Sequence, residues 1–429
     1  MALGLAALLA LSSGDASAQK RPAPAPAKAK ANPAVAESAP LVYAAATVHT
    51  GTGEVITDAT IVVSQGKIQA IGKGAAAPAN AQTITARGMI ITPGLVDALT
   101  SVGLIEVGLE DSTRDDHQSG SDLLRAGFRA SDGYNPASSV IGVTRAEGLT
   151  SVGVIPTGGL IAGQSAWADL DGATAAEAIA AAPLALHVHL DAGSAGDGHA
   201  TALLRVREAF DDARFFQKNR PAYERNQTRR FAPSRLDLEA LTAALDGKLP
   251  VVFHVDRAAE ILAVLGIARE YKLRPVIAGG AEAWKAAREL AAAKVPVIVY
   301  PLQNPSSFDS IGAREDNAAR LAAAGVMVGI STGDTHNARK LRQVAGNAVR
   351  GGLAHEAAIA AITRVPAEAL GLGTRYGTLA PGKVANLVVW SGDPLELSTR
   401  VVDVVIRGQR VSLRNRQTAL FEKYRVLAR

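Results

Sequence analysis

The chain has 429 residues, of which 48% are apolar and 20% are charged. That composition is typical of globular proteins and supplies enough apolar material for one large domain and a smaller one, so it excludes disorder throughout the chain. The formal net charge is only +5, so no nucleic-acid partner is expected, and the expected partner is a small-molecule substrate or ligand. There is no cysteine, which excludes disulfide bonds and a lipid-modified cysteine anchor.

The N-terminus carries an apolar run, MALGLAALLAL at residues 1–11, which is too short to cross a bilayer as a helix. Small residues follow at 16–18 (ASA), at the spacing that signal peptidase prefers, so residues 1–18 are predicted to be a signal peptide cleaved near Ala18. We therefore expect export to the periplasm and no stable membrane span, with a buried N-terminal helix as the alternative. Residues 19–40 are rich in Pro, Ala and Lys and predict an extended linker without a core.

Two distant segments share one pattern of short β-type runs separated by glycine-containing turns. Residues 41–92 contain LVYAAATVHTG and ATIVVSQGKIQAIGKG, and residues 377–412 contain the runs NLVVW and VVDVVIRGQRV. β-branched runs bounded by Gly turns are typical of strands. We expect the two segments to pair into a small composite β-sandwich built from both chain ends, followed by a C-terminal tail at 413–429.

Residues 93–376 alternate between strand-type and helix-type segments. Short β-rich runs begin near Val251, Pro275, Val295 and Val326, and a helix-type segment fills each gap. This repeat predicts a parallel sheet with right-handed crossovers. A distorted (β/α)8 TIM-type barrel is the economical closure of such a sheet, and its chemistry is expected at the carboxyl ends of the strands.

Several stretches carry a resemblance to a known family. They are MIITPGLVD at 89–97, PVVFHVDRAAEI at 250–261 and the block from GNAVRGGLAHEAA to VVWSGDPL at 346–395. Over residues 41–412 the chain resembles the amidohydrolase superfamily, and within it the periplasmic branch similar to imidazolonepropionase. The resemblance implies the barrel and its accompanying sandwich, together with hydrolysis by metal-activated water.

The chain departs from the family at the metal site. The family's first barrel strand ends in Asp-x-His-x-His and supplies two metal ligands, whereas Asp97 is followed here by Leu99 and Ser101. The histidine of the family's sixth strand is also missing, since residues 278–280 read AGG. The resemblance leaves His254 as a ligand and Asp334 as the catalytic carboxylate, so it implies a degenerate metal site.

Two further histidines are candidates for a relocated site. His187 and His189 are two residues apart on an expected strand, so both rings point to one face. Together with His254 and Asp334 they supply the ligand types of a mononuclear zinc-like site. The alternative is that both histidines lie on a peripheral strand, facing solvent or backbone carbonyls.

A glycine-rich stretch, PTGGLIAGQSAW at 156–167, suggests a different kind of site. Its glycines permit a close backbone approach, and Gln164 and Ser165 offer hydrogen bonds to a substrate. The stretch is equally compatible with a turn that needs positive φ.

Two functions from different classes follow from these patterns. The first is an exported amidohydrolase-like hydrolase that cleaves non-peptide C–N bonds of a linear or cyclic amide, using water activated by a divalent metal such as zinc. The second is a catalytically inactive binding protein that keeps the barrel and has lost the metal. Only the first predicts a stoichiometric divalent metal.

Overall fold

The computed structural model describes residues 39–117, 122–190, 198–301, 308 and 310–425. The expected signal peptide (1–18), residues 19–38 of the expected linker and the last four residues of the tail lie outside these ranges. None of the described helices combines the length and the apolar character that crossing a membrane requires.

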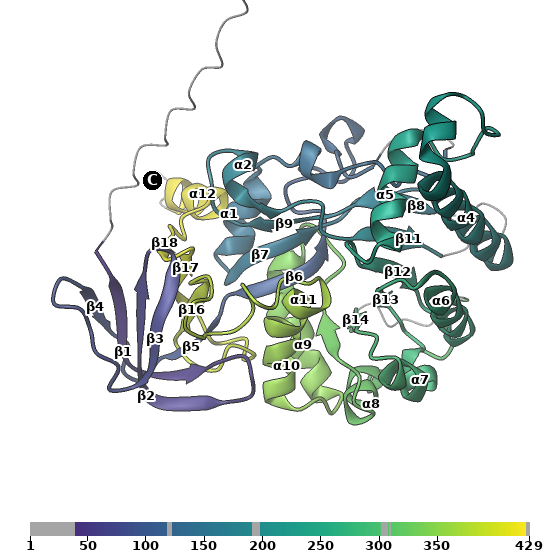
Figure 1. Cartoon of the computed structure of the whole chain (residues 1–429). Helices are drawn as coiled ribbons and strands as arrows, with labels where there is room; N and C mark the ends of the chain where they lie inside the picture. The colour runs from purple at the N-terminus through teal and green to yellow at the C-terminus, as the bar shows by residue number, and fades with distance from the viewer. Residues whose placement is uncertain (1–38, 118–121, 191–197, 302–307, 309, 426–429) are drawn as a thin grey trace, which may run out of the picture. The chain divides into compact units, whose positions relative to one another are not determined.

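Strands from both ends of the chain form one eight-stranded sheet with the order β18-β17-β16-β5-β1-β2-β3, and β4 pairs with β1 (Figure 1). The bounds are β1 Leu41–His49, β2 Val55–Ser64, β3 Lys67–Lys73, β4 Gln82–Thr85, β5 Ile90–Pro93, β16 Leu387–Trp390, β17 Val401–Ile406 and β18 Gln409–Arg410. The two ends meet where β16 runs antiparallel to β5. All of these strands belong to one hydrogen-bonded sheet, which confirms that the two ends of the chain pair. The packing of two sheets into a sandwich stays a prediction.

Two short turns set the register of this sheet. Gln65 and Gly66 both have positive φ between β2 and β3, and Arg407 and Gly408 do so between β17 and β18. Positive φ at both central residues is the signature of the two-residue hairpin turn whose twist matches that of the strands. The two turns therefore fix the pairing of β2 with β3 and of β17 with β18.

The rest of the described chain is a mixed α/β structure with two sheets, ordered β10-β9-β7-β6 and β15-β14-β13-β12-β11-β8. The bounds are β6 Leu95–Thr100, β7 Leu149–Val154, β8 Ile161–Gln164, β9 Ala166–Asp169, β10 Ile179–Ala181, β11 Leu186–His189, β12 Val251–Val255, β13 Pro275–Gly279, β14 Val297–Val299 and β15 Val328–Ile330. Strands β11 to β15 are all parallel. The strand and helix alternation predicted for the second half of the chain is thereby confirmed.

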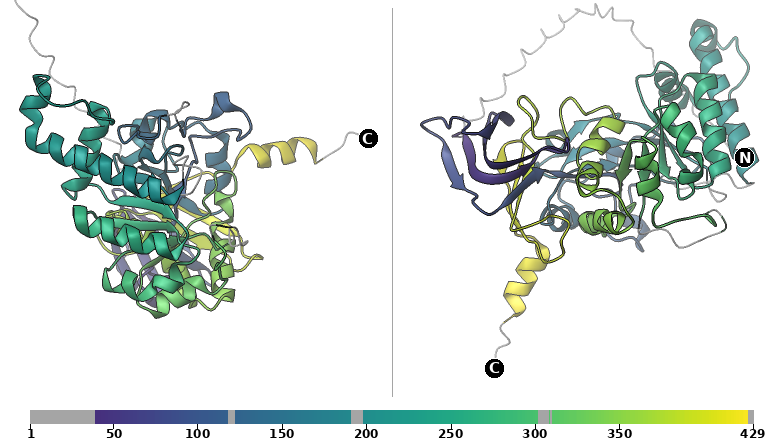
Figure 2. Two further views of the ribbon diagram at one scale, coloured as in Figure 1. Left: turned by 90° about the vertical axis from the view of Figure 1, so that its right-hand side faces the viewer. Right: turned by 90° about the horizontal axis from the view of Figure 1, so that it is seen from below.

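Helices connect and cover these strands. Their bounds are α1 Ser139–Arg145, α2 Ala175–Ala178, α4 His199–Glu224, α5 Arg235–Leu245, α6 Ala258–Tyr271, α7 Ala287–Ala292, α8 Asn317–Ala323, α9 Leu341–Arg350, α10 His355–Ala361, α11 Arg364–Ala369 and α12 Arg416–Tyr424. Four 3-10 turns are η1 Asp111–Thr113, η2 Ala130–Gly133, η3 Ala283–Ala286 and η4 Ala338–Lys340. Helix α12 has no buried residue and projects from the α/β part in both views of Figure 2.

Alternation along the parallel strands separates two apolar layers. One face packs Val251, Phe253 and Val255 of β12 into the large cluster that the helices share. The other face packs Val252 of β12, with side chains of β13 and β14, into a smaller cluster around Trp167. His254 is two residues after Val252 and therefore lies on this second, inner face.

Candidate functional site

Polar side chains gather where the parallel strands end. Carboxyl ends of parallel strands lie at the same edge of a sheet, so residues far apart in the sequence meet there. The residues at this edge are His187 and His189 on β11, His254 on β12, Asp256 just after β12, Tyr300 after β14, and Ser331 and Thr332 after β15.

The structure brings together the three histidines predicted as metal ligands. His187 Nδ1 and His254 Nε2 lie 2.9 Å apart. The rings of His189 and His254 stack with centroids 4.0 Å apart and an interplanar angle of 8°. The cause is the strand register, because His189 and His254 are direct partners in the β11/β12 ladder and His187 lies two residues earlier on the same face.

Burial keeps the imidazoles of His187 and His254 neutral. It lowers the pKa of His187 and of His254 well below the usual range, and the neighbouring imidazoles lower both further. His187 is 1% exposed, and its Nε2 has no hydrogen-bond partner among the described residues. A buried nitrogen without a partner is costly, so this atom is available to a ligand.

The cluster is not a preformed three-ligand site. Within the described ranges, three His or carboxylate ligand atoms lie within 4.8 Å of one another only in a different group, formed by His49, His355 and Glu356. A metal that took His187 Nδ1 or His254 Nε2 as a ligand would have to replace the hydrogen bond between these two atoms. The donor types fit a divalent ion, whereas their spacing fits it only after that bond opens.

Asp97 joins the first strand of the α/β part to the last. It is fully buried, and its carboxylate accepts hydrogen bonds from Ser331 Oγ, from Thr332 Oγ1 at 2.5 Å and from Thr332 N at 3.1 Å. Burial raises the pKa of Asp97 to about 6, although these hydrogen bonds oppose the rise. Across the described residues β6 and β15 share no backbone ladder, so Asp97 is a side-chain clamp between them.

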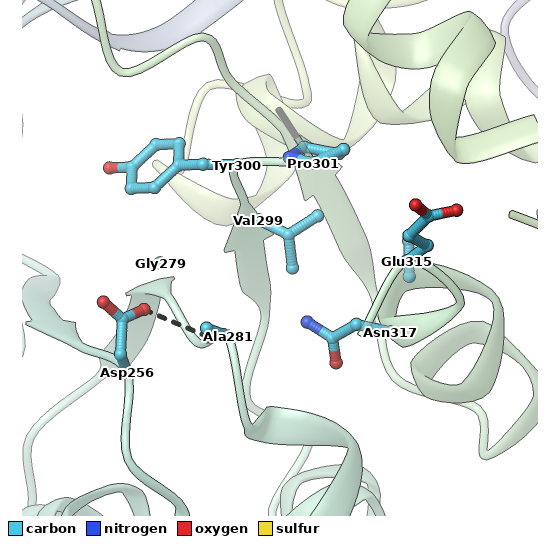
Figure 3. Close-up of a pocket in the computed structure, with 9 residues that line it drawn as sticks. Asp256, Gly279, Ala281, Val299, Tyr300, Pro301, Glu315 and Asn317 are labelled. Carbon is cyan, nitrogen blue, oxygen red and sulfur yellow. Dashed lines mark hydrogen bonds between the residues drawn. The ribbon is translucent and has the colours of Figure 1, made fainter. Parts of the chain in front are cut away.

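A small cavity of about 30 Å³ lies beside this edge, enough for one or two water molecules. In Figure 3, Asp256 and Tyr300 lie on one side of it and Glu315 and Asn317 on the other. Burial raises the pKa of Tyr300 far above its usual range, and Asp97 and Asp256 raise it further. The Tyr300 hydroxyl therefore keeps its proton and can donate a hydrogen bond.

Gly279 explains part of the departure from the family pattern on this strand. Its φ is +87°, and a Cβ at this position would lie 2.7 Å from Asp256 Oδ1. The same oxygen accepts a hydrogen bond from Ala281 N at 3.0 Å. The position where a sixth-strand histidine was missing in the sequence thus accommodates the Asp256 carboxylate.

Neither substituted first-strand position offers a ligand in this structure. Leu99 is fully buried in the inner apolar cluster. Ser101 is 7% exposed, and its carbonyl accepts hydrogen bonds from Leu104 N and Ile105 N. Both residues serve packing and the local turn.

Asp334, the predicted catalytic base, lies in the turn after β15. Its carboxylate accepts hydrogen bonds from Asn337 N at 3.0 Å and Asn337 Nδ2 at 2.9 Å. Burial alone would raise the pKa of Asp334, but hydrogen bonds from Asn337 and the His336 backbone hold it below the usual range. Within the described chain these contacts orient Asp334 toward its own turn, and its role as a base stays a prediction.

The side chains of Gln164 and Ser165 donate hydrogen bonds to backbone groups rather than to the histidines. Strand β8 runs antiparallel to β11 and pairs Gln164 with Leu186, the residue before His187. Gln164 Nε2 donates to Ala126 O at 2.8 Å, and Ser165 Oγ donates to Ala185 O at 3.3 Å. These contacts hold the backbone, and a substrate-binding role for them stays a prediction.

Sequence reasoning missed Tyr300 and the Ser331–Thr332 pair. Each directly follows a short apolar strand, in VIVY and VGIST. A polar residue at the carboxyl end of a predicted barrel strand was the available signal. It was weak, because nothing local shows that Asp97 is the partner of residues more than 230 positions away.

The sequence model of the family described as "Amidohydrolase family" matches residues 173–411, which is more than half of the 429 residues. The chain belongs to the amidohydrolase family. All three clustered histidines of this amidohydrolase lie within the matched range, while Asp97 precedes it.

Known proteins agree with this assignment. A solved amidohydrolase from Thermotoga maritima has a TM-score of 0.79 and 28% identity, covering 87% of this chain and 100% of that one. Amidohydrolase tasK of Hapsidospora irregularis is 25% identical over 380 residues, 77% of this chain and 37% of that protein. A dihydroorotase of Geobacter sulfurreducens is 36% identical over 114 residues, 24% of this chain and 25% of that protein. The chain thus spans well under two thirds of the length of these two relatives.

Proposed function

We propose that this amidohydrolase hydrolyses a non-peptide C–N bond of a cyclic or linear amide at the carboxyl ends of its parallel strands. The observation that carries the proposal is the contact among His187, His189 and His254 at that edge. Sequence similarity to a dihydroorotase and to an amidohydrolase supports hydrolysis of a C–N bond as the reaction class. In this proposal the two sheets of the α/β part together form the distorted (β/α)8 barrel.

The donor set suits a divalent metal such as zinc. His187, His189 and His254 would hold it, because three neutral imidazoles form a known catalytic zinc set. When bound, such an ion lowers the pKa of a coordinated water toward neutrality and polarises a carbonyl. Burial keeps the His187 and His254 rings unprotonated and able to bind.

The chain's own groups would bind the substrate and move its protons. The Tyr300 hydroxyl, protonated throughout the physiological range, can donate to a substrate carbonyl. Asp334 is the proton acceptor proposed from the sequence, and Asp256, two residues after His254 and beside Tyr300 at the cavity, is a second candidate from the structure. Asp97 holds the ends of β6 and β15 in place and is a positioning residue.

Two observations favour the second function, a metal-free binding protein. His187 and His254 satisfy each other with a hydrogen bond, and Leu99 fills a position where the family supplies a ligand. In that case the inner face is a packed core that retains its histidines without an ion. The similarity to known amidohydrolases does not favour this alternative, and a measurement of bound metal distinguishes the hydrolase from the binding protein.

The test is metal content and amide hydrolysis of the full chain against a His187→Ala/His189→Ala/His254→Ala variant. A matched control for the metal content is His336→Ala, which removes an exposed histidine outside the cluster. We expect the triple variant to lose one equivalent of zinc and all hydrolysis of a panel of linear and cyclic amides. Equal metal content in wild type and triple variant would exclude the metal-dependent mechanism and leave the binding protein.

If hydrolysis is found, Asp256→Asn and Asp334→Asn identify the proton acceptor. Loss of the true acceptor lowers kcat by about 100-fold or more and removes the acidic limb of the kcat pH profile. The variant of the other carboxylate keeps the wild-type kcat and the acidic limb of the pH profile. A profile unchanged in both variants would exclude both carboxylates.

We further propose export to the periplasm with cleavage near Ala18, as in the imidazolonepropionase-like branch that the chain resembles. The support is the apolar run and the ASA site within residues 1–18. Expression of the full chain in a Gram-negative host, followed by fractionation and N-terminal sequencing, is the test. A mature N-terminus at Gln19 in the periplasmic fraction is expected, and an intact N-terminus in the cytoplasm would contradict it.

A further inference from the structure

A second group of ligand-type side chains lies between the chain-end sheet and helix α10. His49 is the last residue of β1, and His355 and Glu356 are the first two residues of α10. Glu356 Oε1 lies 2.9 Å from His49 Nδ1 and 3.2 Å from His355 Nδ1. The ligand atoms of the three residues all lie within 4.8 Å of one another, and none of them belongs to the strand-end cluster.

We propose that His49, His355 and Glu356 bind one zinc ion or a similar transition-metal dication. Ligands about 2.0–2.2 Å from a tetrahedral zinc are roughly 3.3–3.6 Å apart. The nitrogen to oxygen distances of 2.9 and 3.2 Å are shorter than that spacing, so the side chains would have to move apart by a few tenths of an ångström to complete the site. Two imidazoles and one carboxylate are a common zinc donor set and leave the fourth position to water.

An ion can reach this group from solvent. The side chains of Glu356 and His355 are 31% and 36% exposed, whereas that of His49 is 10% exposed. The site therefore has a buried floor on the sheet and an open side on the helix. Partly exposed imidazole and carboxylate ligands permit metal exchange without unfolding.

Asp393 provides the outer contact that metal-binding histidines usually have. His355 Nε2 lies 2.8 Å from Asp393 Oδ2 and 3.0 Å from Asp393 Oδ1. A carboxylate on this outer nitrogen keeps the ring proton there, so the lone pair of Nδ1 points toward Glu356. In a neutral His355 the lone pair of Nδ1 would then lie 3.2 Å from the carboxylate oxygen Oε1 of Glu356, which is a repulsive contact. A cation bound between the two atoms would make both contacts attractive.

A second feature of Glu356 also favours a bound ion. Its Oε2 is buried and has no hydrogen-bond partner among the described residues. A buried carboxylate oxygen without a donor is costly. Coordination of the carboxylate through both of its oxygens would compensate for that missing donor.

The competing explanation needs no metal. A doubly protonated His355 would donate one hydrogen bond to Asp393 and one to Glu356, and the pKa of His355 is raised by these two carboxylates against the effect of burial. The cluster would then be an ion-paired contact that joins the two parts of the fold. Zinc binding distinguishes the two explanations, because only the metal site responds to the ion.

The proposed ion would tie together segments separated by 307 positions, from His49 to Glu356. A ligand that binds the folded state alone stabilises it in proportion to the logarithm of its concentration above Kd. We therefore expect free zinc to raise the Tm by roughly 2–5 °C at about 100 times Kd. Magnesium, which prefers oxygen ligands in octahedral geometry, should have no effect.

The experiment starts from the full chain carrying His187→Ala/His189→Ala/His254→Ala, so that the strand-end cluster cannot contribute. In this background, His49→Ala and the isosteric Glu356→Gln are compared with the matched surface control His336→Ala by zinc calorimetry, cobalt absorption spectra and melting curves. Circular dichroism in chelator shows that each variant is folded, and either folded ligand variant is sufficient for the conclusion.

We expect one zinc per chain in the background and in the control, visible bands of four-coordinate cobalt, and at least 100-fold weaker binding after His49→Ala or Glu356→Gln. Asp393→Asn should weaken zinc binding by about 10–100-fold. Zinc affinity equal to the background in the folded ligand variants, or no zinc binding in the background, would overturn the proposal. Because the strand-end histidines are absent, neither result depends on the proposed hydrolase function.

Discussion

The buried Asp97 carboxylate is expected to make the stability of the protein depend on pH, and Asp97→Asn should remove that dependence. Folded Asp97 keeps its proton up to about pH 6, whereas its ordinary pKa is 3.8. Between these values the folded state binds more protons than the unfolded state, so the free energy of unfolding falls as the pH rises. The difference of about 2 in pKa corresponds to about 3 kcal/mol, present below pH 4 and lost once the pH exceeds 6.

Urea unfolding followed by circular dichroism, at several pH values from about 4 to about 7, measures this effect. Other groups titrate alike in wild type and Asp97→Asn, so the difference between the two free energies isolates Asp97. Wild type should lose about 3 kcal/mol relative to the variant across this range. A difference that stays constant, or that grows in the opposite direction, would refute burial as the dominant influence on Asp97. Asp334→Asn is a control for which the pH dependence of stability has the opposite sign. The pKa of Asp334 is lowered in the folded state, so the free energy that its carboxylate adds to folding is lost as the pH falls.

Three other substitutions test the packing of the strands and helices and the structural role of Gln164. Gly153→Ala places a Cβ against the backbone carbonyl of Ala98 on the neighbouring strand, so thermal and urea unfolding should show a loss of about 3 kcal/mol. Gly266→Ala in α6, where a Cβ meets nothing within 4 Å, should instead add about 0.5–1 kcal/mol. Gln164→Ala leaves the Ala126 carbonyl without its donor and should lower the free energy of unfolding by about 1–2 kcal/mol, with no change in KM for any amide found to be a substrate. An increased KM with unchanged stability would instead support the substrate-binding role predicted from the sequence.

The local parts of the fold were accessible from the sequence because they depend on neighbours in the chain. Short β-rich runs separated by helix-type segments marked the strands that begin at Val251 and Pro275, which the structure contains. The period of two along a strand placed His187 and His189 on one face, which the ring contacts show. Glycine turns such as the one at Gly66 likewise indicated where hairpins reverse.

The relation between segments was accessible only in part. The shared pattern of β-type runs and glycine turns indicated that the ends of the chain pair, and they share one sheet. The antiparallel direction of β8, which places Gln164 beside the start of β11, has no local signal. A strand pattern specifies which side chains share a face but leaves the partner strand and its direction open.

By itself, the sequence determined the strands and helices of the second half of the chain, its family, and the histidines that lie on one face of a strand. The strands, the helices and the shared face of the histidines arise from periodicity and turn chemistry over a few residues, whereas the family was indicated by the resemblance of longer stretches such as residues 346–395. Tertiary structure alone decided that Asp97 meets Ser331 and Thr332, and that His49 meets Glu356, across more than 230 positions. Such contacts depend on how sheets and helices pack, because burial and register bring together polar groups that no local pattern relates.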